Sequence, residues 1–181
     1  ERPSSLLAET GGVFEIIQFW VNTPSEHKMD NPYYKPISSE ETPKIERDKV
    51  TISVVAGEFE GIKGVVPTFT PQKLLRIDTK TGADFELDIP ETYNSLIYLL
   101  NGELVVNGQS AESKEMIWFE NAGTEINIKA NKDTRAMLLS GEPIREPIAS
   151  YGPFVMNTQT EIKQAIRDSQ SGEMGALIEE F

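Results

Sequence analysis

The sequence contains no cysteine and a single histidine, His27, among its 181 residues. Without cysteine there is no disulfide, no thiol nucleophile and no zinc-finger pattern, and nothing in this composition points outside the cytoplasm. No apolar run approaches the roughly 20 residues that cross a bilayer. The first residues also lack the basic region followed by an apolar one that marks a signal peptide. We therefore expect a cytoplasmic protein that makes no membrane contact.

Basic residues are scarce as well. Lys and Arg number 17 against 29 Asp and Glu, which gives a net charge of −12. A surface this acidic repels nucleic acid and anionic lipid. We expect no direct binding to DNA or RNA, and we interpret the charge as keeping the protein in solution.

The sequence does contain a series of short apolar runs separated by turn residues. Its 13 Gly and 11 Pro favour many short strands over long helices. The pattern predicts a mainly β fold, with an antiparallel barrel or sandwich over roughly residues 48–145. The predicted strands are residues 50–55, 65–66, 74–77, 85–89, 96–100, 103–106, 116–119, 125–128 and 135–139.

Residues 93–106 place Asn101-Gly102 between two of these runs. Asn-Gly is the strongest short hairpin signal, because a type I′ turn needs a positive φ at both central residues. We expect a hairpin here, at the centre of the barrel. None of its residues is His, so the segment contains no imidazole group that could bind a metal ion.

The barrel is preceded by two segments of different character. Residues 13–21 are apolar except at Glu15 and Gln18 and predict a strand that needs sheet partners. Residues 22–48 are polar and contain four prolines, which predicts an extended linker.

The C-terminal region predicts a short amphipathic helix. Thr158 stands three residues before Glu161, the spacing of a capping box. Gly172 is a stop signal, and residues 173–181 are expected to continue weakly helical. The apolar face of the helix consists of Ile162, Ala165 and Ile166.

Several longer runs follow one another in a specific order. They are Gln18-Phe19-Trp20-Val21-Asn22, Lys28-Met29, Pro32-Tyr33-Tyr34, Gly141-Glu142-Pro143-Ile144-Arg145-Glu146-Pro147, and Gly152-Pro153-Phe154-Val155-Met156-Asn157-Thr158 with Glu161-Ile162 and Gln164-Ala165. Across nearly the whole chain, their order and spacing resemble the pirin family.

The resemblance implies a bicupin, in which two similar barrels face one another across a linker. The fold expected here is a cupin-type (RmlC-like) antiparallel β-barrel with a short C-terminal helix. Residues 1–24 would be a remnant of the N-terminal barrel, 25–47 the linker, 48–147 the C-terminal barrel, and 148–181 a C-terminal segment and helix. Most of the N-terminal barrel would then be absent from this chain.

The resemblance also implies where a metal is held. Pirin relatives bind one iron or another divalent metal in the N-terminal barrel, through a His-x-His pair and a later His-x-Glu pair. In relatives the ligand Glu is followed by one residue and then Pro, which makes Glu1 of Glu1-Arg2-Pro3 the candidate for it. The C-terminal barrel is expected to be metal-free.

The polar residues of this chain agree with that expectation. His27, alone in the linker beside Glu26, is expected to be solvated. Glu86 and Asp88 alternate with apolar residues on a predicted strand and are expected to face solvent, as is Glu103. We predict no catalytic, cofactor-binding or metal-binding residue in this chain.

Three larger side chains have alternative roles. Trp20 and Trp118 could line a pocket, but we expect both in the core. Arg145, between Glu142 and Glu146, is expected to form a structural ion pair rather than a substrate clamp.

Two functions remain for the intact protein. In the first, it is a metal-dependent dioxygenase of the quercetin 2,3-dioxygenase type, and this chain is its metal-free structural half. In the second, it is a non-enzymatic regulatory binding protein, a transcription cofactor or a partner of a metabolic enzyme. The expected partner in both cases is the missing N-terminal barrel. Without it, we expect self-association through residues 13–21 and the C-terminal helix, or disorder of the N-terminal segment through Val21.

Overall fold

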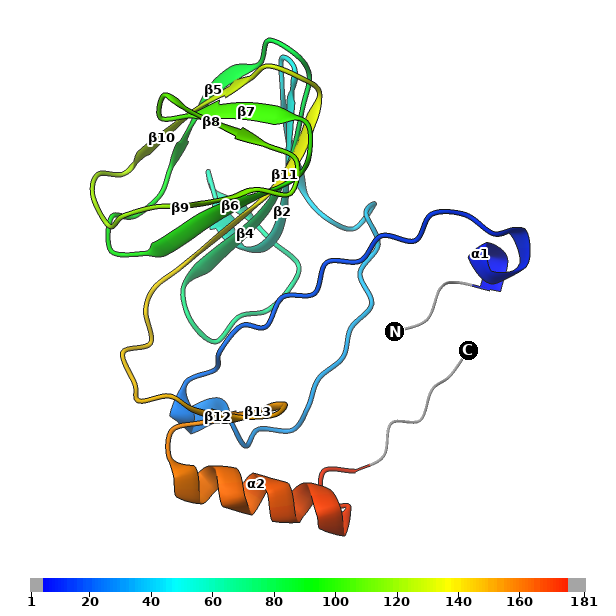
Figure 1. Ribbon diagram of the computed structural model, residues 1–181, viewed down its shortest axis with the longest axis vertical. Helices are drawn as coiled ribbons and strands as arrows, with labels where there is room; N and C mark the ends of the chain where they lie inside the picture. The colour runs from blue at the N-terminus through cyan, green and yellow to red at the C-terminus, as the bar shows by residue number, and fades with distance from the viewer. Residues whose placement is uncertain (1–4, 176–181) are drawn as a thin grey trace.

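The computed structural model describes residues 5–175 and shows a β-barrel joined to a smaller C-terminal unit of one hairpin and one helix (Figure 1). An extended N-terminal segment runs beneath the barrel, between it and the C-terminal unit. The elements in chain order are α1 (Ser5–Thr10), the 3₁₀ helix η1 (Ser25–His27), β1 (Lys44–Arg47), β2 (Val50–Phe59), β3 (Ile62–Lys63), β4 (Gln72–Thr79), β5 (Asp84–Asp88), β6 (Asn94–Asn101), β7 (Glu103–Val106), β8 (Gln109–Glu112), β9 (Met116–Trp118), β10 (Glu125–Ala130), β11 (Thr134–Gly141), β12 (Ala149–Tyr151), β13 (Phe154–Met156) and α2 (Gln159–Ser171).

Two antiparallel sheets form the barrel. The seven-stranded sheet has the order β1-β2-β4-β11-β6-β9, with β3 paired to β2, and the four-stranded sheet has the order β5-β10-β7-β8. Side chains alternate between buried and exposed along strands such as β10, as the period of two in a strand requires. The predicted mainly β, antiparallel barrel is confirmed.

The space between the two sheets is filled by hydrocarbon side chains. Both sheets contribute, and the largest of these side chains have almost no exposed surface. Burial of this apolar surface is the main force that holds the sheets together. The largest fully buried residues are Phe59, Ile52, Leu75, Ile77, Leu87, Ile97, Leu99, Leu104, Ile128, Leu138 and Val54.

The predicted hairpin at Asn101-Gly102 is wrong. The strand β6 pairs with β11 and β9, whereas β7 pairs with β10 and β8, so the chain passes here from one sheet to the other. Only Gly102 of the two residues has a positive φ, at 88°. The type I′ hairpin lies instead at Asn107-Gly108, where φ is 47° and 82° between the paired strands β7 and β8. Both Asn-Gly dipeptides have the same local preference for a hairpin turn. Which of them joins two paired strands is decided by how the strands pair across the barrel.

Gly102 is required because another strand passes very close to it. A Cβ atom at this position would lie 2.1 Å from Thr134 Oγ1 and 2.5 Å from the carbonyl oxygen of Asp133. The same hydroxyl accepts a hydrogen bond from the Glu103 backbone N–H at 2.9 Å. The turn into β7 is thus fastened to the start of β11.

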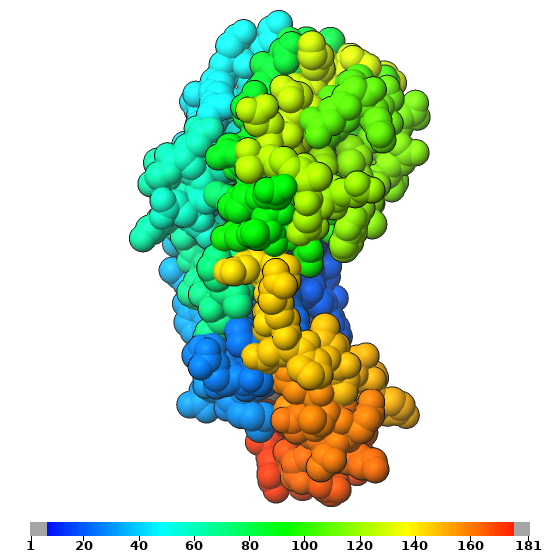
Figure 2. Space-filling view, turned by 90° about the vertical axis from the view of Figure 1, so that its left-hand side faces the viewer, coloured from blue at the N-terminus to red at the C-terminus, as the bar shows by residue number. Residues whose placement is uncertain are grey.

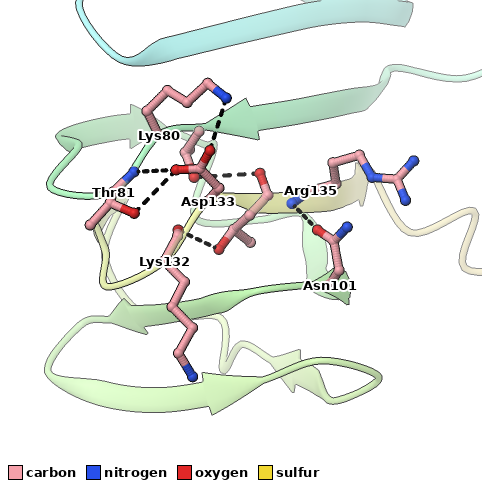
Figure 3. Close-up of polar contacts among 8 residues, drawn as sticks. Lys80, Thr81, Asn101, Lys132, Asp133 and Arg135 are labelled. Atoms are coloured by element: carbon pink, nitrogen blue, oxygen red, sulfur yellow. Dashed lines mark hydrogen bonds and ion pairs between the residues drawn. The ribbon is translucent and has the colours of Figure 1, made fainter.

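At this end of the barrel, Asp133 joins neighbouring loops in which the chain passes from one sheet to the other (Figure 3). Its carboxylate accepts hydrogen bonds from Lys80 Nζ at 2.8 Å and from the Thr81 backbone N–H at 2.9 Å. The Arg135 N–H donates to Asn101 Oδ1 at 2.8 Å. The Lys80 ammonium and the Thr81 donors lower the pKa of Asp133 to about 2.

The segments before β2 depart from the prediction in two ways. Residues 13–21, predicted as a strand, are in no sheet, because a strand needs a partner for its backbone groups and the described part of the chain supplies none. The segment predicted as linker contains η1 and β1, and β1 pairs with β2 at the edge of the larger sheet. The predicted strand at residues 65–66 is reduced to one isolated bridge, between Val66 and Ala56.

The C-terminal helix is confirmed in detail. Thr158 and Glu161 form the capping box, and Gly172 ends the helix with a left-handed φ of 78°. Residues 173–175 do not continue the helix, contrary to expectation, and residues 176–181 lie outside the described part. Ile162 and Ala165 are buried where α2 packs on the β12–β13 hairpin. The apolar face of the helix is therefore already covered.

A pair of glycine substitutions tests the close approach at Gly102. Gly108→Ala places a side chain in open space and loses only about 1–2 kcal/mol to the left-handed backbone. Gly102→Ala adds an overlap with the backbone of residues 133–134, so we expect a loss of roughly 3 kcal/mol or more. Urea unfolding of both variants measures the difference, and equal losses would contradict the role given to Gly102.

Acid unfolding tests Asp133. Its pKa in the folded state is below the unfolded value, so its bonds contribute stability above about pH 4 that is lost as the pH falls toward 2. We expect Asp133→Asn to show a flatter dependence of the urea midpoint on pH between these limits. Asp88→Asn, at an exposed carboxylate on β5 with no ion pair in the described structure, is the control and should keep the slope of the parent chain.

Candidate functional site

A cleft of about 900 Å³ lies outside the barrel. It lies between the extended N-terminal segment, the loop that follows β3, and the β12–β13 hairpin. The space-filling view shows that the molecule narrows to a waist between the barrel and the C-terminal helix (Figure 2). A cleft of this size with an aromatic lining is typical of binding sites. Its rings are those of Trp20, His27, Tyr33, Tyr34 and Phe69.

His27 is held in this cleft rather than solvated as expected. Its ring stacks on Phe69 with 4.5 Å between the ring centroids. Its Nδ1 lies 2.9 Å from Asp30 Oδ2, and its Nε2 lies 3.6 Å from Glu26 Oε1. Phe69 comes from a loop more than forty residues away, so no pattern near His27 predicts this contact. Within the described structure His27 bonds to carboxylates and to no hydroxyl, so it forms no nucleophile–base pair.

A polar junction holds the start of the linker against the C-terminal unit. Glu146 accepts hydrogen bonds from the Ser25 N–H at 2.9 Å and from Asn157 Nδ2 at 2.8 Å. The Ser25 N–H, and more weakly Asn157, lower the pKa of Glu146. The ion pair expected between Arg145 and Glu142 or Glu146 is absent from the described contacts. Arg145 has a positive φ and an exposed side chain, and Glu146 is engaged by Ser25 and Asn157 instead.

The carboxylates of the barrel do not converge. Glu86 and Asp88 lie exposed on β5, as predicted. Glu103 is not freely solvated as expected: it is partly buried and bonds to Lys132 at 2.8 Å and Asn131 at 2.9 Å. The Lys132 ammonium, followed by Asn131, lowers its pKa. Each carboxylate thus has a structural partner or open solvent, and none points into the core.

The donor set of this barrel does not fit a mononuclear iron site, which needs several imidazoles and a carboxylate at one point. Residues 5–175 hold no group of three or more His, Asp or Glu side chains placed to bind a metal ion. The interior positions carry Ile, Leu, Val and Phe instead. Glu1, the candidate ligand of the missing barrel, lies outside the described residues.

Both tryptophans were expected in the core, and both expectations are wrong. Trp20 is 66% exposed and lines the cleft, and Trp118 is 64% exposed on the edge strand β9. Each lies on a surface that the described part of the chain leaves uncovered. Exposed aromatic side chains are typical of surfaces that contact another molecule.

None of the helices in residues 5–175 has the length and hydropathy needed to pass through a lipid bilayer.

Comparison with known proteins gives a consistent result. Residues 74–175 match the family model described as the Pirin C-terminal cupin domain. A pirin-like protein of Solanum lycopersicum is 36% identical over 168 residues, which are 91% of this chain and 58% of that protein. Pirin of Homo sapiens is 38% identical over 164 residues, 88% of this chain and 57% of the human protein.

A solved structure agrees with these relatives. The crystal structure of a quercetin 2,3-dioxygenase from Acinetobacter baumannii matches with a TM-score of 0.83 and 36% identity, covering 88% of this chain and 56% of that one. The chain thus spans somewhat more than half the length of the relatives it matches. With a family model that covers residues 74–175 and relatives that match almost the whole chain, the protein belongs to the pirin family, with its cupin barrel matching the C-terminal domain of that family.

Proposed function

We propose that this chain is the structural half of a two-barrel protein of the quercetin 2,3-dioxygenase type. In this proposal an N-terminal cupin barrel binds iron or another divalent metal and supports oxidation of a flavonol by O₂. The similarity to the Acinetobacter baumannii dioxygenase supports the reaction type. The share of the relatives that the chain spans, 57% for human pirin, supports the existence of a further barrel.

The apolar barrel interior is the observation that carries the structural role. A cupin barrel that binds a metal must place imidazole and carboxylate groups at its centre. Here the corresponding space is packed with side chains such as Ile97, Leu99 and Leu138, all without exposed surface. Replacing this packing by polar ligands would leave them buried without partners, at a large cost in stability. The barrel is built to be a rigid support.

The support would act through the segment that leads out of the N-terminal barrel. The junction of Ser25, Glu146 and Asn157 fixes this segment to the C-terminal unit, and the stack of His27 on Phe69 fixes it to the barrel. A preceding domain would thereby be held in a defined orientation over the cleft.

Activity measurements test the proposal. We expect quercetin loss with this chain and added Fe²⁺, Mn²⁺ or Ni²⁺ to be no faster than with the metal ion in buffer. The intact protein with its N-terminal barrel should contain close to one metal ion and turn quercetin over until a chelator is added. Sustained, chelator-sensitive turnover by this chain alone would overturn the assignment of chemistry to the other barrel.

The exposed aromatic cleft favours a second candidate, a non-enzymatic protein that regulates a partner. Its open, apolar lining at Trp20, Tyr33 and Tyr34 suits a protein surface as well as a domain of the same chain. An intact protein with bound metal but without turnover of quercetin would support this second function over the first.

Hydrogen exchange tests the junction at Glu146. Glu146→Ala removes the acceptor of the Ser25 N–H and of Asn157, so we expect amides of residues 22–28 to exchange several-fold faster than in the parent chain. Glu142→Ala, four residues away at an exposed side chain that accepts no hydrogen bond in the described structure, should leave this exchange unchanged. Equal rates in the two variants would show that Glu146 does not hold the segment.

A further inference from the structure

His27 is the single histidine of the sequence, and both nitrogens of its ring face carboxylates. Its Nδ1 lies 2.9 Å from Asp30 Oδ2, and its Nε2 lies 3.6 Å from Glu26 Oε1. A neutral imidazole has one N–H and one lone pair, whereas an imidazolium has two N–H groups and a positive charge. The neutral ring can therefore donate to only one of the two carboxylates and turns its lone pair toward the other. Only the protonated ring satisfies both.

The face of the same ring connects this part of the linker to the barrel. The ring stacks on Phe69, which lies in the loop between β3 and β4, with 4.5 Å between the centroids and 23° between the planes. A cation over an aromatic face is attracted to it more strongly than a neutral group, because the ring face is electron-rich. Protonation of His27 thus strengthens the stack on Phe69 as well as the two carboxylate contacts that fix the plane of the ring.

The other groups around His27 do not provide a second titration in the same range. The loop between β3 and β4 and the β12–β13 hairpin contribute only uncharged side chains to the lining of the cleft. The titratable groups beside the ring all belong to the linker and are Glu26, Lys28, Asp30, Tyr33, Tyr34 and Lys35. Carboxyl groups ordinarily titrate below about pH 5, and tyrosine and lysine above about pH 9, so histidine is the residue type that changes charge between these values. Lys28 does not compete for the two carboxylates, since its Nζ donates to Asn22 Oδ1 at 2.6 Å.

We propose that residues 24–30 form a pH-sensitive latch, which protonated His27 holds against the barrel and which loosens when the ring loses its proton. The stabilisation is present in full at mildly acidic pH and decreases as the pH rises through the range in which histidine titrates. The latch holds the start of the linker and, with it, one wall of the aromatic cleft. Its contacts lie within this chain, whereas an effect on the orientation of a preceding barrel rests on the proposed function.

Hydrogen exchange at two pH values tests the latch. The amides of His27, Lys28 and Asp30 donate backbone hydrogen bonds within it. After correction for the intrinsic pH dependence of exchange, we expect these amides to exchange roughly five-fold more slowly at about pH 5.5 than at about pH 8. His27→Phe keeps an aromatic ring beside Phe69 and removes the titrating group, so its corrected rates should be equal at the two pH values. Equal corrected rates in the unsubstituted chain, or an unchanged pH dependence in His27→Phe, would overturn the proposal.

A pair of double variants tests the part played by the two carboxylates. Glu26→Gln with Asp30→Asn keeps the acceptor oxygens beside the ring and removes both negative charges, so we expect most of the pH dependence to be lost. Glu46→Gln with Asp48→Asn removes the same charge at exposed side chains on β1 and in the turn after it, and should keep the full pH dependence.

The ring contact can be read independently by NMR. Because the chain has no other histidine, the ring protons of His27 are assigned without ambiguity. Their nuclear Overhauser effect to the Phe69 ring should be stronger at about pH 5.5 than at about pH 8 in the unsubstituted chain and in the Glu46→Gln, Asp48→Asn variant. Equal behaviour of the two double variants would overturn the proposal, and neither measurement depends on quercetin turnover by the intact protein.

Discussion

The close approach of two backbones at Gly102 and Thr134 is the contact on which the barrel depends. At this point β6 of one sheet continues into β7 of the other, and any side chain at Gly102 would overlap the start of β11. The Thr134 hydroxyl bonds to the turn itself, and Asp133 bonds to the neighbouring crossing at Lys80 and Thr81. Because these loops between the sheets are hydrogen-bonded to one another, they fix the distance between the two sheets. The apolar core fills the space between them.

The residues between the two sheets are mainly hydrocarbon side chains. The space between the sheets has room for hydrocarbon and none for polar ligands, so a ligand set could be introduced only by dismantling the packing. The groups able to contact another molecule lie outside the barrel, in the cleft around His27 and along residues 13–21.

Prediction from the sequence succeeded where the signal is local. The capping box of Thr158 and Glu161, the left-handed Gly172 and the strands β4 to β7 and β9 to β11 need only neighbouring residues to be recognised. It failed at Asn101-Gly102, because an Asn-Gly pair specifies a sharp turn but not which strand is met after it. β8 was missed because its residues have low strand propensity, and pairing with β7 alone makes it a strand.

The fold class, the family resemblance and the small number of potential metal ligands follow from residue types and their spacing alone. Which side chains are covered depends on contacts between segments that are distant in the sequence. Tryptophan is a residue type often found in protein cores, but Trp20 and Trp118 lie exposed. His27 lies in a segment predicted to be a solvated linker, but its ring stacks on Phe69. Exposure depends on whether a distant segment arrives to exclude water, and within residues 13–21 only Ile17 and Phe19 are partly covered.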